Sequence, residues 1–168
     1  VRMKTNLILI GMKHCGKRTV GRQLAGRLGA TFIDTDDLLA VTWAAENGQP
    51  LSVREIYRRV GPESFAELEK RAVRGLLERN GPLVIAVGGK TATYSDLQDD
   101  LRRLGTVVYL KVNENELFGR VMAGGLPPFL DPADPKGSFV AICRERAPAY
   151  ESLADATVDL NDLSPEQA

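Results

Sequence analysis

Short apolar runs recur along the chain and are separated by longer segments of mixed character. The runs are continuous rather than alternating, which is typical of strands buried on both faces of a parallel sheet. Gly88 and Gly89 close the third run, and β-branched residues are frequent in the fourth. The pattern predicts five strands, at 7–10, 31–33, 83–87, 106–110 and, more weakly, 156–160.

The intervening segments carry apolar residues at helical spacing. Ser52 and Glu55 have the spacing of a capping box, and Asn113 and Glu116 begin a further helix in the same way. Strands alternating with helices predict an α/β fold, with a parallel sheet and helices on both of its faces. The apolar stripes comprise Val20, Leu24 and Leu28, then Phe65, Leu68, Ala72, Val73 and Leu76, then Leu117, Val121 and Met122.

One segment fits neither pattern. Residues 124–135 hold four prolines and two glycines, which excludes a helix interior or a central strand. A loop of this length in a small domain is usually functional or mobile. We interpret residues 124–137 as a lid over a site, and a passive surface loop is the alternative.

Composition fits one globular domain over residues 1–168. Lysine plus arginine number 22, aspartate plus glutamate also number 22, and apolar residues make up 43%. A neutral chain with 6% aromatic residues is a poor candidate for binding nucleic acid. No apolar run reaches membrane-spanning length. We therefore expect no nucleic-acid or membrane partner, and a monomer or weak oligomer acting on a small molecule.

Cysteine and histidine usage favours the cytoplasm. Cys15 and Cys143 are too few for a disulfide framework, and His14 is the only histidine, so no zinc spacing exists. Residues 1–6 lack the apolar core of a signal peptide. Residues 163–168 have the composition of a helix start.

The strongest motif is 11–19, which follows the first predicted strand and opens a helix. Its Gly-x4-Gly-Lys spacing lets backbone N–H groups surround a phosphate, and its glycines allow the turn and a close approach. Lys17 would reach the β- and γ-phosphates of a nucleotide, and the helix N-terminus adds positive potential. A chance glycine turn is the alternative. The nucleotide-binding residues predicted here are Gly11, Lys13, Cys15, Gly16, Lys17, Arg18 and Thr19.

This motif has a defect at Arg18. The position after the lysine should carry the hydroxyl that binds Mg²⁺, and a guanidinium has donors but no acceptor. Thr19 comes one residue too late for that role. Three readings stay open: a metal held by nucleotide, water and one carboxylate; Arg18 neutralising phosphate charge itself; or nucleotide binding without phosphoryl transfer.

Together these features resemble the shikimate kinases, a P-loop family with a nucleoside-monophosphate-kinase-like fold. The resemblance covers nearly the whole chain. It implies three layers around a five-stranded parallel sheet, ATP and Mg²⁺ as cofactors, and phosphoryl transfer to a ring hydroxyl of shikimate, a step of aromatic amino acid biosynthesis. The segments that carry the resemblance are 16–22, 32–37, 88–89, 107–110 and 146–150.

The resemblance assigns two carboxylates after the second strand. Asp34 matches the carboxylate near Mg²⁺, and Asp36 matches the one that holds the acceptor hydroxyls and takes the proton. A carboxylate at the C-terminal end of a strand can orient a hydroxyl in this way. Asp36, together with Lys17 of the phosphate loop, is therefore predicted to be catalytic. An N-cap role for Asp36 in the next helix is the alternative.

The resemblance also implies a substrate floor and two arginine contacts. Gly88 and Gly89 match the floor, Arg146 matches a contact to the substrate carboxylate, and Arg120 matches a residue near the adenine. The alternatives are a plain strand-ending turn for the glycines and a solvated helix surface for each arginine.

Four positions depart from the family pattern. Besides Arg18, Ala66 and Pro127 stand where the family has arginines for the substrate and the lid, and Lys90 replaces the third floor glycine. Two lost arginine contacts would weaken carboxylate binding by about 3–6 kcal/mol. Lys90 is predicted to bind substrate in compensation, although it can equally fill the pocket or lie on the surface.

Two functions are consistent with this sequence. The first is ATP-dependent phosphoryl transfer to a hydroxyl of a small anionic metabolite, with shikimate a candidate. The second is a degenerate member that binds nucleotide without efficient kinase activity. A nucleic-acid-directed P-loop protein is a third reading, which the charge balance disfavours.

Overall fold

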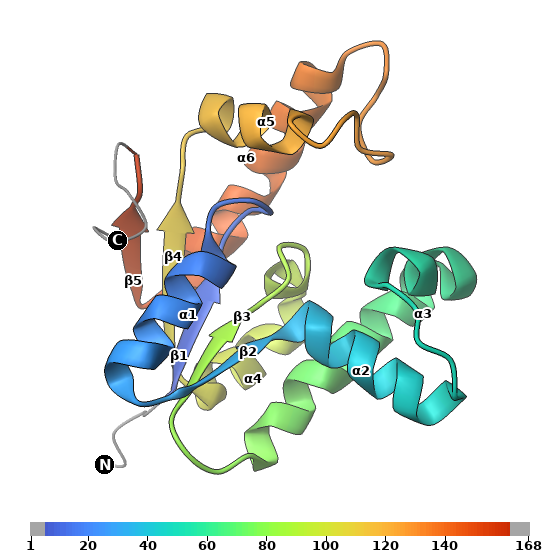
Figure 1. Ribbon diagram of the computed structural model, residues 1–168. Helices are drawn as coiled ribbons and strands as arrows, with labels where there is room; N and C mark the ends of the chain where they lie inside the picture. The colour runs from blue at the N-terminus through green and yellow to red at the C-terminus, as the bar shows by residue number, and fades with distance from the viewer. Residues whose placement is uncertain (1–5, 162–168) are drawn as a thin grey trace.

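Five parallel strands form the centre of the molecule, in the order β2-β3-β1-β4-β5 (Figure 1). The computed structural model describes residues 6–161. Leu9 of the central strand pairs with Ala86 on one side and Val108 on the other. The five predicted strands are confirmed, with ends that differ by at most one residue. They are β1 (Leu7–Ile10), β2 (Thr31–Asp34), β3 (Leu83–Ala86), β4 (Thr106–Lys111) and β5 (Ala156–Asp159).

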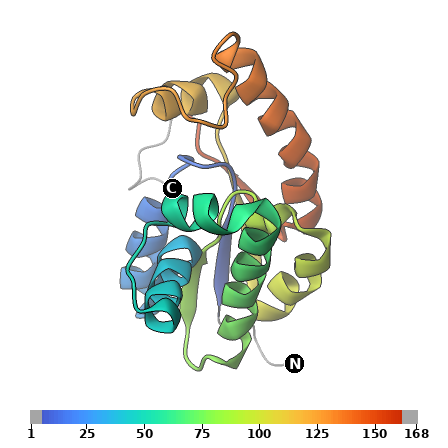
Figure 2. The ribbon, with the colours of Figure 1, turned by 90° about the vertical axis from the view of Figure 1, so that its right-hand side faces the viewer.

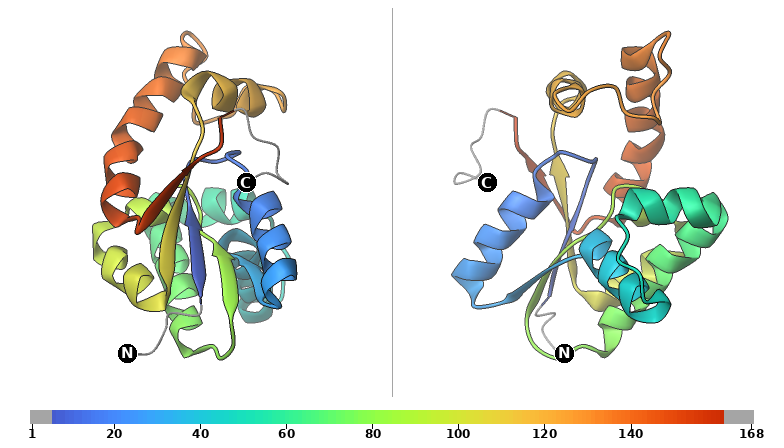
Figure 3. Two further views of the ribbon diagram at one scale, coloured as in Figure 1. Left: turned by 90° about the vertical axis from the view of Figure 1, so that its left-hand side faces the viewer. Right: turned by 45° about the vertical axis from the view of Figure 1, so that its right-hand side comes forward.

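Helices cover both faces of this sheet, as the alternating pattern predicts. One face packs against α1, and the other is covered by α3, α4 and α6 (Figure 3). Short 3₁₀ turns at 76–78, 91–93 and 95–97 join some of these elements. The helices are α1 (Lys17–Leu28), α2 (Thr35–Asn47), α3 (Val53–Gly75), α4 (Gln98–Leu104), α5 (Glu114–Met122) and α6 (Pro135–Leu153).

Local sequence signals determine where several helices begin. Ser52 and Glu55 form both hydrogen bonds of the predicted capping box at the start of α3. Asn113 accepts from the backbone N–H of Glu116 at 2.8 Å and so begins α5. The first half of α3 is separated from the second at Gly61, whose φ of 80° is not helical, and Pro62 restarts the helix.

The predicted lid ends earlier than expected. Regular structure stops after α5 and resumes at Pro135, so the loop spans 123–134 and residues 135–137 belong to α6. Proline is compatible with the first turn of a helix, where its missing N–H is not needed. Asp134 caps this turn by accepting from the N–H of Gly137 at 2.9 Å.

The apolar core lies on both sides of the sheet, and the central strands are buried almost completely. A second, smaller cluster of Leu39, Ile56 and Phe65 lies between α2 and α3. Cys15 and Cys143 are buried free thiols. Within residues 6–161, no helix combines the length and apolarity needed to cross a membrane. The helix start predicted at 163–168 lies outside the described residues, and the single domain over 1–168 stays a prediction.

The contact between α1 and β2 depends on a helical glycine. A Cβ on Gly21 would lie 2.5 Å from Cε2 of Phe32, whereas a Cβ on Gly26 of the same helix would meet nothing within 4 Å. We expect Gly21→Ala to destabilise the protein by about 1–3 kcal/mol through overpacking, despite the better helix propensity of alanine.

Gly26→Ala is the matched control, and we expect it to stabilise the protein by up to about 1 kcal/mol. Urea unfolding of both variants measures these free energies. Equal effects of the two substitutions would contradict the packing described here.

Candidate active site

The phosphate loop connects β1 to α1 through backbone conformations that suit glycine. Gly11 and Gly16 have φ values of 142° and 103°, and His14 is the non-glycine residue with positive φ in the described part of the chain. A Cβ on Gly11 would lie 2.7 Å from the carbonyl oxygen of Leu110. The glycine spacing therefore meets a steric requirement of this turn, which leads into the N-terminus of α1.

Lys17 begins α1 and folds back over the loop. Its Nζ donates to the carbonyl oxygens of Gly11 at 2.8 Å and Met12 at 2.9 Å. Arg120 of α5 donates to the carbonyl oxygen of His14 at 3.0 Å and also pairs with Glu116. The loop is thus held by two cations, and Arg120 lies against the loop itself.

Asp34, rather than Asp36, caps α2. Its Oδ1 accepts from the N–H groups of Asp36 at 2.9 Å and Asp37 at 3.4 Å. Its Oδ2 accepts from Nε of Arg18 at 3.2 Å, and the same guanidinium contacts Asp37 at 2.9 Å. The alternative N-cap role thus belongs to Asp34, which leaves the side chain of Asp36 available for the site.

The residues present do not fit a Mg²⁺ ion held by the protein. Both oxygens of Asp34, the predicted ligand, already accept hydrogen bonds, and the expected hydroxyl position carries the guanidinium of Arg18. Over residues 6–161, no three His, Cys, Asp or Glu side chains gather into a possible metal cluster. The prediction of Asp34 as a metal ligand therefore finds no support in this geometry.

Gly88 and Gly89 follow β3 and form the floor beside the phosphate loop. The N–H of Gly88 donates to Oγ1 of Thr35 at 3.0 Å, and the carbonyl of Gly89 accepts from the hydroxyl of Tyr150 at 2.6 Å. A Cβ on Gly89 would lie 3.4 Å from the carbonyl oxygen of Gly11 and from the N atom of Lys13. The floor and the phosphate loop are therefore in direct backbone proximity.

Two carboxyl groups approach the floor at Gly88. A Cβ on this glycine would lie 3.2 Å from Oδ1 of Asp36 and 3.5 Å from Oε1 of Glu69. Burial raises the pKa of Asp36, and the negative charge of Asp34 adds to the effect. Burial likewise raises the pKa of Glu69, although hydrogen bonds from Tyr94 and Thr91 oppose the shift. Asp36 lines the cavity described below, whereas Glu69 is buried beside the same glycine. Raised pKa values of acidic groups cluster at functional sites, so this end of β3 is a candidate for proton transfer.

Glu69 is a buried acid next to the floor that the sequence reasoning missed. It is 8% exposed and accepts from the hydroxyls of Thr91 at 2.7 Å and Tyr94 at 2.6 Å. Its position was detectable, because it lies four residues after Phe65 and four before Val73 on an otherwise apolar stripe.

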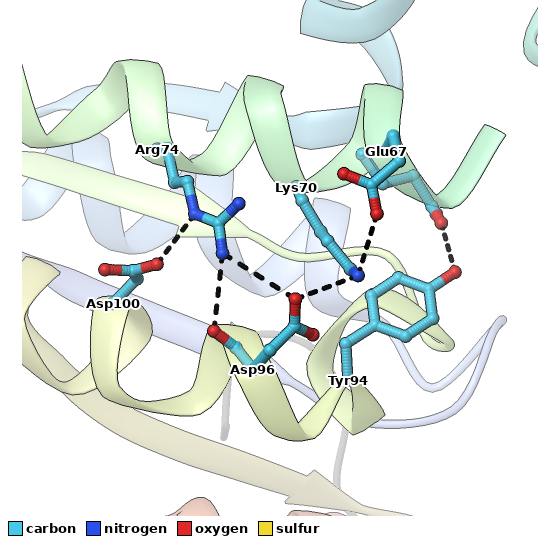
Figure 4. A network of polar contacts seen from close by, with 7 residues as sticks. Glu67, Lys70, Arg74, Tyr94, Asp96 and Asp100 are labelled. Atoms are coloured by element: carbon cyan, nitrogen blue, oxygen red, sulfur yellow. Dashed lines mark hydrogen bonds and ion pairs between the residues drawn. The ribbon is translucent and has the colours of Figure 1, made fainter. Parts of the chain in front are cut away.

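A polar network holds the segment that carries Tyr94 against α3 (Figure 4). Lys70 pairs with Asp96 at 2.9 Å and with Glu67 at 3.0 Å. Arg74 donates from Nε to Asp100 at 2.9 Å. Surface ion pairs individually contribute little stability, but together these pairs hold the segment that carries Tyr94, one of the two donors to Glu69.

One cavity of about 1020 Å³ joins the phosphate loop, the floor and the lid. Pro128 and Phe129 of the lid line it, whereas Gly11, Ala66 and Pro127 do not. The loop, the lid and the first half of α3 lie at the same end of the sheet (Figure 2). The predicted residues that line this cavity are Lys13, Cys15, Gly16, Lys17, Arg18, Thr19, Asp34, Asp36, Gly88, Gly89, Lys90, Arg120 and Arg146.

Cations outnumber carboxylates around this cavity. Lys90 lines it, as the compensation hypothesis requires, and Arg54 at the start of α3 is an additional lining cation that sequence reasoning did not single out. In the part of the chain that the structure describes, neither these two side chains nor Lys13 and Arg146 form an ion pair. Such a surface favours anionic ligands.

The sheet order, the glycine loop and the joined cavity define a P-loop kinase fold of the small-molecule type. A family model described as shikimate kinase matches residues 13–168. The chain belongs to the shikimate kinase family.

Individual relatives agree with this membership. A shikimate kinase of Synechococcus sp. (strain CC9605) is 36% identical over 96% of this chain and 77% of its own. Shikimate kinase 1 of Yersinia enterocolitica is 32% identical over 96% of this chain and 90% of its own. The structure of the Acinetobacter baumannii shikimate kinase in complex with shikimate superposes with a TM-score of 0.80 at 28% identity, covering 94% of this chain and 83% of that one.

The buried Glu69 gives stability a predictable pH dependence. Its pKa in the folded protein is raised above the ordinary value of 4.5, so the folded state holds its proton to higher pH than the unfolded state does. The free energy of unfolding therefore falls as pH rises through this window. We expect Glu69→Gln to abolish this contribution to the pH dependence. The free energy of unfolding of the variant then increases relative to that of wild type as the pH rises.

Urea unfolding at a series of pH values between 4 and 8 is the measurement, and Glu63→Gln, at an exposed position of the same helix, is the control. Parallel pH curves for wild type and Glu69→Gln would show that Glu69 is not desolvated.

Proposed function

We propose that this chain transfers the γ-phosphoryl group of ATP to a hydroxyl of a small anionic metabolite, with shikimate as the first candidate. The observation that carries the proposal is the joined cavity, in which the floor glycine Gly89 lies against the phosphate loop. Family membership supports shikimate as acceptor, because the Acinetobacter baumannii relative was solved in complex with it.

The phosphoryl transfer is assigned to groups of this chain as follows. Loop amides and Lys17 bind the phosphates, and Asp36 orients the acceptor. The acceptor oxygen attacks the γ-phosphorus, the new P–O bond forms, and the bond to the β,γ-bridging oxygen breaks, leaving ADP. The hydroxyl proton passes to the carboxylate of Asp36, whose pKa is raised by burial and which is therefore a stronger base.

An assay of ADP release with a panel of hydroxylated carboxylic acids, shikimate included, tests this proposal. We expect shikimate-dependent ADP release above the rate with ATP alone, and a decrease of about 10²–10⁴-fold in Asp36→Asn. Asp99→Asn, at an exposed position of α4 outside the cavity, is the control. Acceptor-independent ADP release across the whole panel contradicts the proposal.

A second candidate function is nucleotide binding without efficient turnover. It is favoured by the ion-paired Arg18 and by a lid that contains no arginine. An arginine on the transferring phosphate can contribute about 10³–10⁵ in rate, so its absence from the lid is a substantial loss. Tight nucleotide binding with no acceptor-dependent turnover is the outcome that supports this function.

The position of Lys90 predicts which kinetic constant changes when this residue is replaced. Because Lys90 lies at the floor rather than at the loop, we expect Lys90→Ala to raise KM for the acceptor by about tenfold and to leave KM for ATP nearly unchanged. Arg103→Ala is the control, because it removes an exposed cation of α4. An equal effect on both KM values would assign Lys90 to general electrostatics instead of acceptor binding.

A further inference from the structure

Arg18 holds two carboxylates at the position where the phosphate motif normally carries a hydroxyl. Its Nη2 lies 3.1 Å from Asp34 and 2.9 Å from Asp37, and its Nε donates to Asp34. The two acids come from the end of β2 and the first turn of α2, so the guanidinium joins the start of α1 to the neighbouring strand and helix.

The guanidinium retains donors for a further ligand. Nε and Nη2 make the contacts to Asp34 and Asp37, and no hydrogen bond from Nη1 is formed with any of residues 6–161. Half of the side chain is exposed, and it lines the cavity beside Lys17. A guanidinium fixed by two carboxylates can therefore donate to a phosphate oxygen without giving up either contact.

A divalent cation would compete with this arrangement. Asp34 has both oxygens engaged, so an ion ligated by it would have to displace Arg18 or lie beside a positive charge. A cation bound to Asp34 and the guanidinium of Arg18 would repel each other, and the repulsion is stronger where water is partly excluded.

We propose that Arg18 takes the place of a protein-held metal ion, so that the site binds nucleoside di- and triphosphates in their metal-free form. Arg18 then bridges the phosphates to Asp34 and Asp37. The proposal rests on the nucleotide binding in the proposed function and specifies the chemical form of the nucleotide.

Isothermal titration with ATP and ADP, in EDTA and in excess MgCl₂, tests this inference on the full chain. For wild type we expect Kd values that agree within about threefold between the two conditions. For Arg18→Ser we expect metal-free binding to weaken by about tenfold or more, because a charge-assisted contact is lost. Mg²⁺ then restores part of the affinity of this variant, because serine supplies the missing hydroxyl.

Arg22→Ser is the matched control. It removes an exposed cation from the same helix, outside the cavity, where the guanidinium lies 5.7 Å from the ring centroid of Phe32. We expect it to bind nucleotide as wild type does, and thermal unfolding of both variants checks that each is folded.

Each other outcome has a definite meaning. Wild-type binding that is more than about tenfold tighter with Mg²⁺ overturns the inference and leaves the proposed kinase function standing. Unchanged metal-free affinity in Arg18→Ser also overturns it. An absence of nucleotide binding under both conditions overturns the inference and the proposed function together.

Discussion

The close approach of two backbones at the middle of the sheet determines the geometry of the site. β1 pairs directly with β3, so the loop after one strand and the floor after the other share the same edge. Glycine at position 89 leaves 3.4 Å between the place of a Cβ and the phosphate loop. Tyr150, fully buried, fixes this approach through its hydroxyl. The phosphate loop and the glycine floor are therefore neighbours because β1 and β3 are adjacent in the sheet.

The sequence was sufficient for the features that depend on local chemistry. Continuous apolar runs predicted all five strands, and side-chain caps predicted the starts of α3 and α5, because both signals act over a few residues. The lid boundary was misplaced, because proline excludes a helix interior but suits the first turn, as Pro135 shows. Arg54 was missed because only the fold brings it to the cavity. Glu69 was missed although its place on an apolar helix stripe marked it as a buried acid.

The distribution of charge explains how a neutral protein suits anionic ligands. Opposite charges on the outer surface largely pair with each other, as between α3 and the 96–100 segment. Around the cavity, by contrast, Lys13, Lys90 and Arg146 face the space without a carboxylate partner among the described residues. Net charge alone therefore says little about this site, because its potential arises from local imbalance.

The interruption of α3 at Gly61 separates two stretches of the helix that both line the cavity. The half before it carries Arg54 and Tyr57 and rests, through Ile56, on the small apolar cluster shared with α2. The phosphate loop rests on the main core. The wall at the start of α3 and the phosphate loop therefore pack on different apolar clusters, so a substitution that repacks one of them leaves the packing of the other intact.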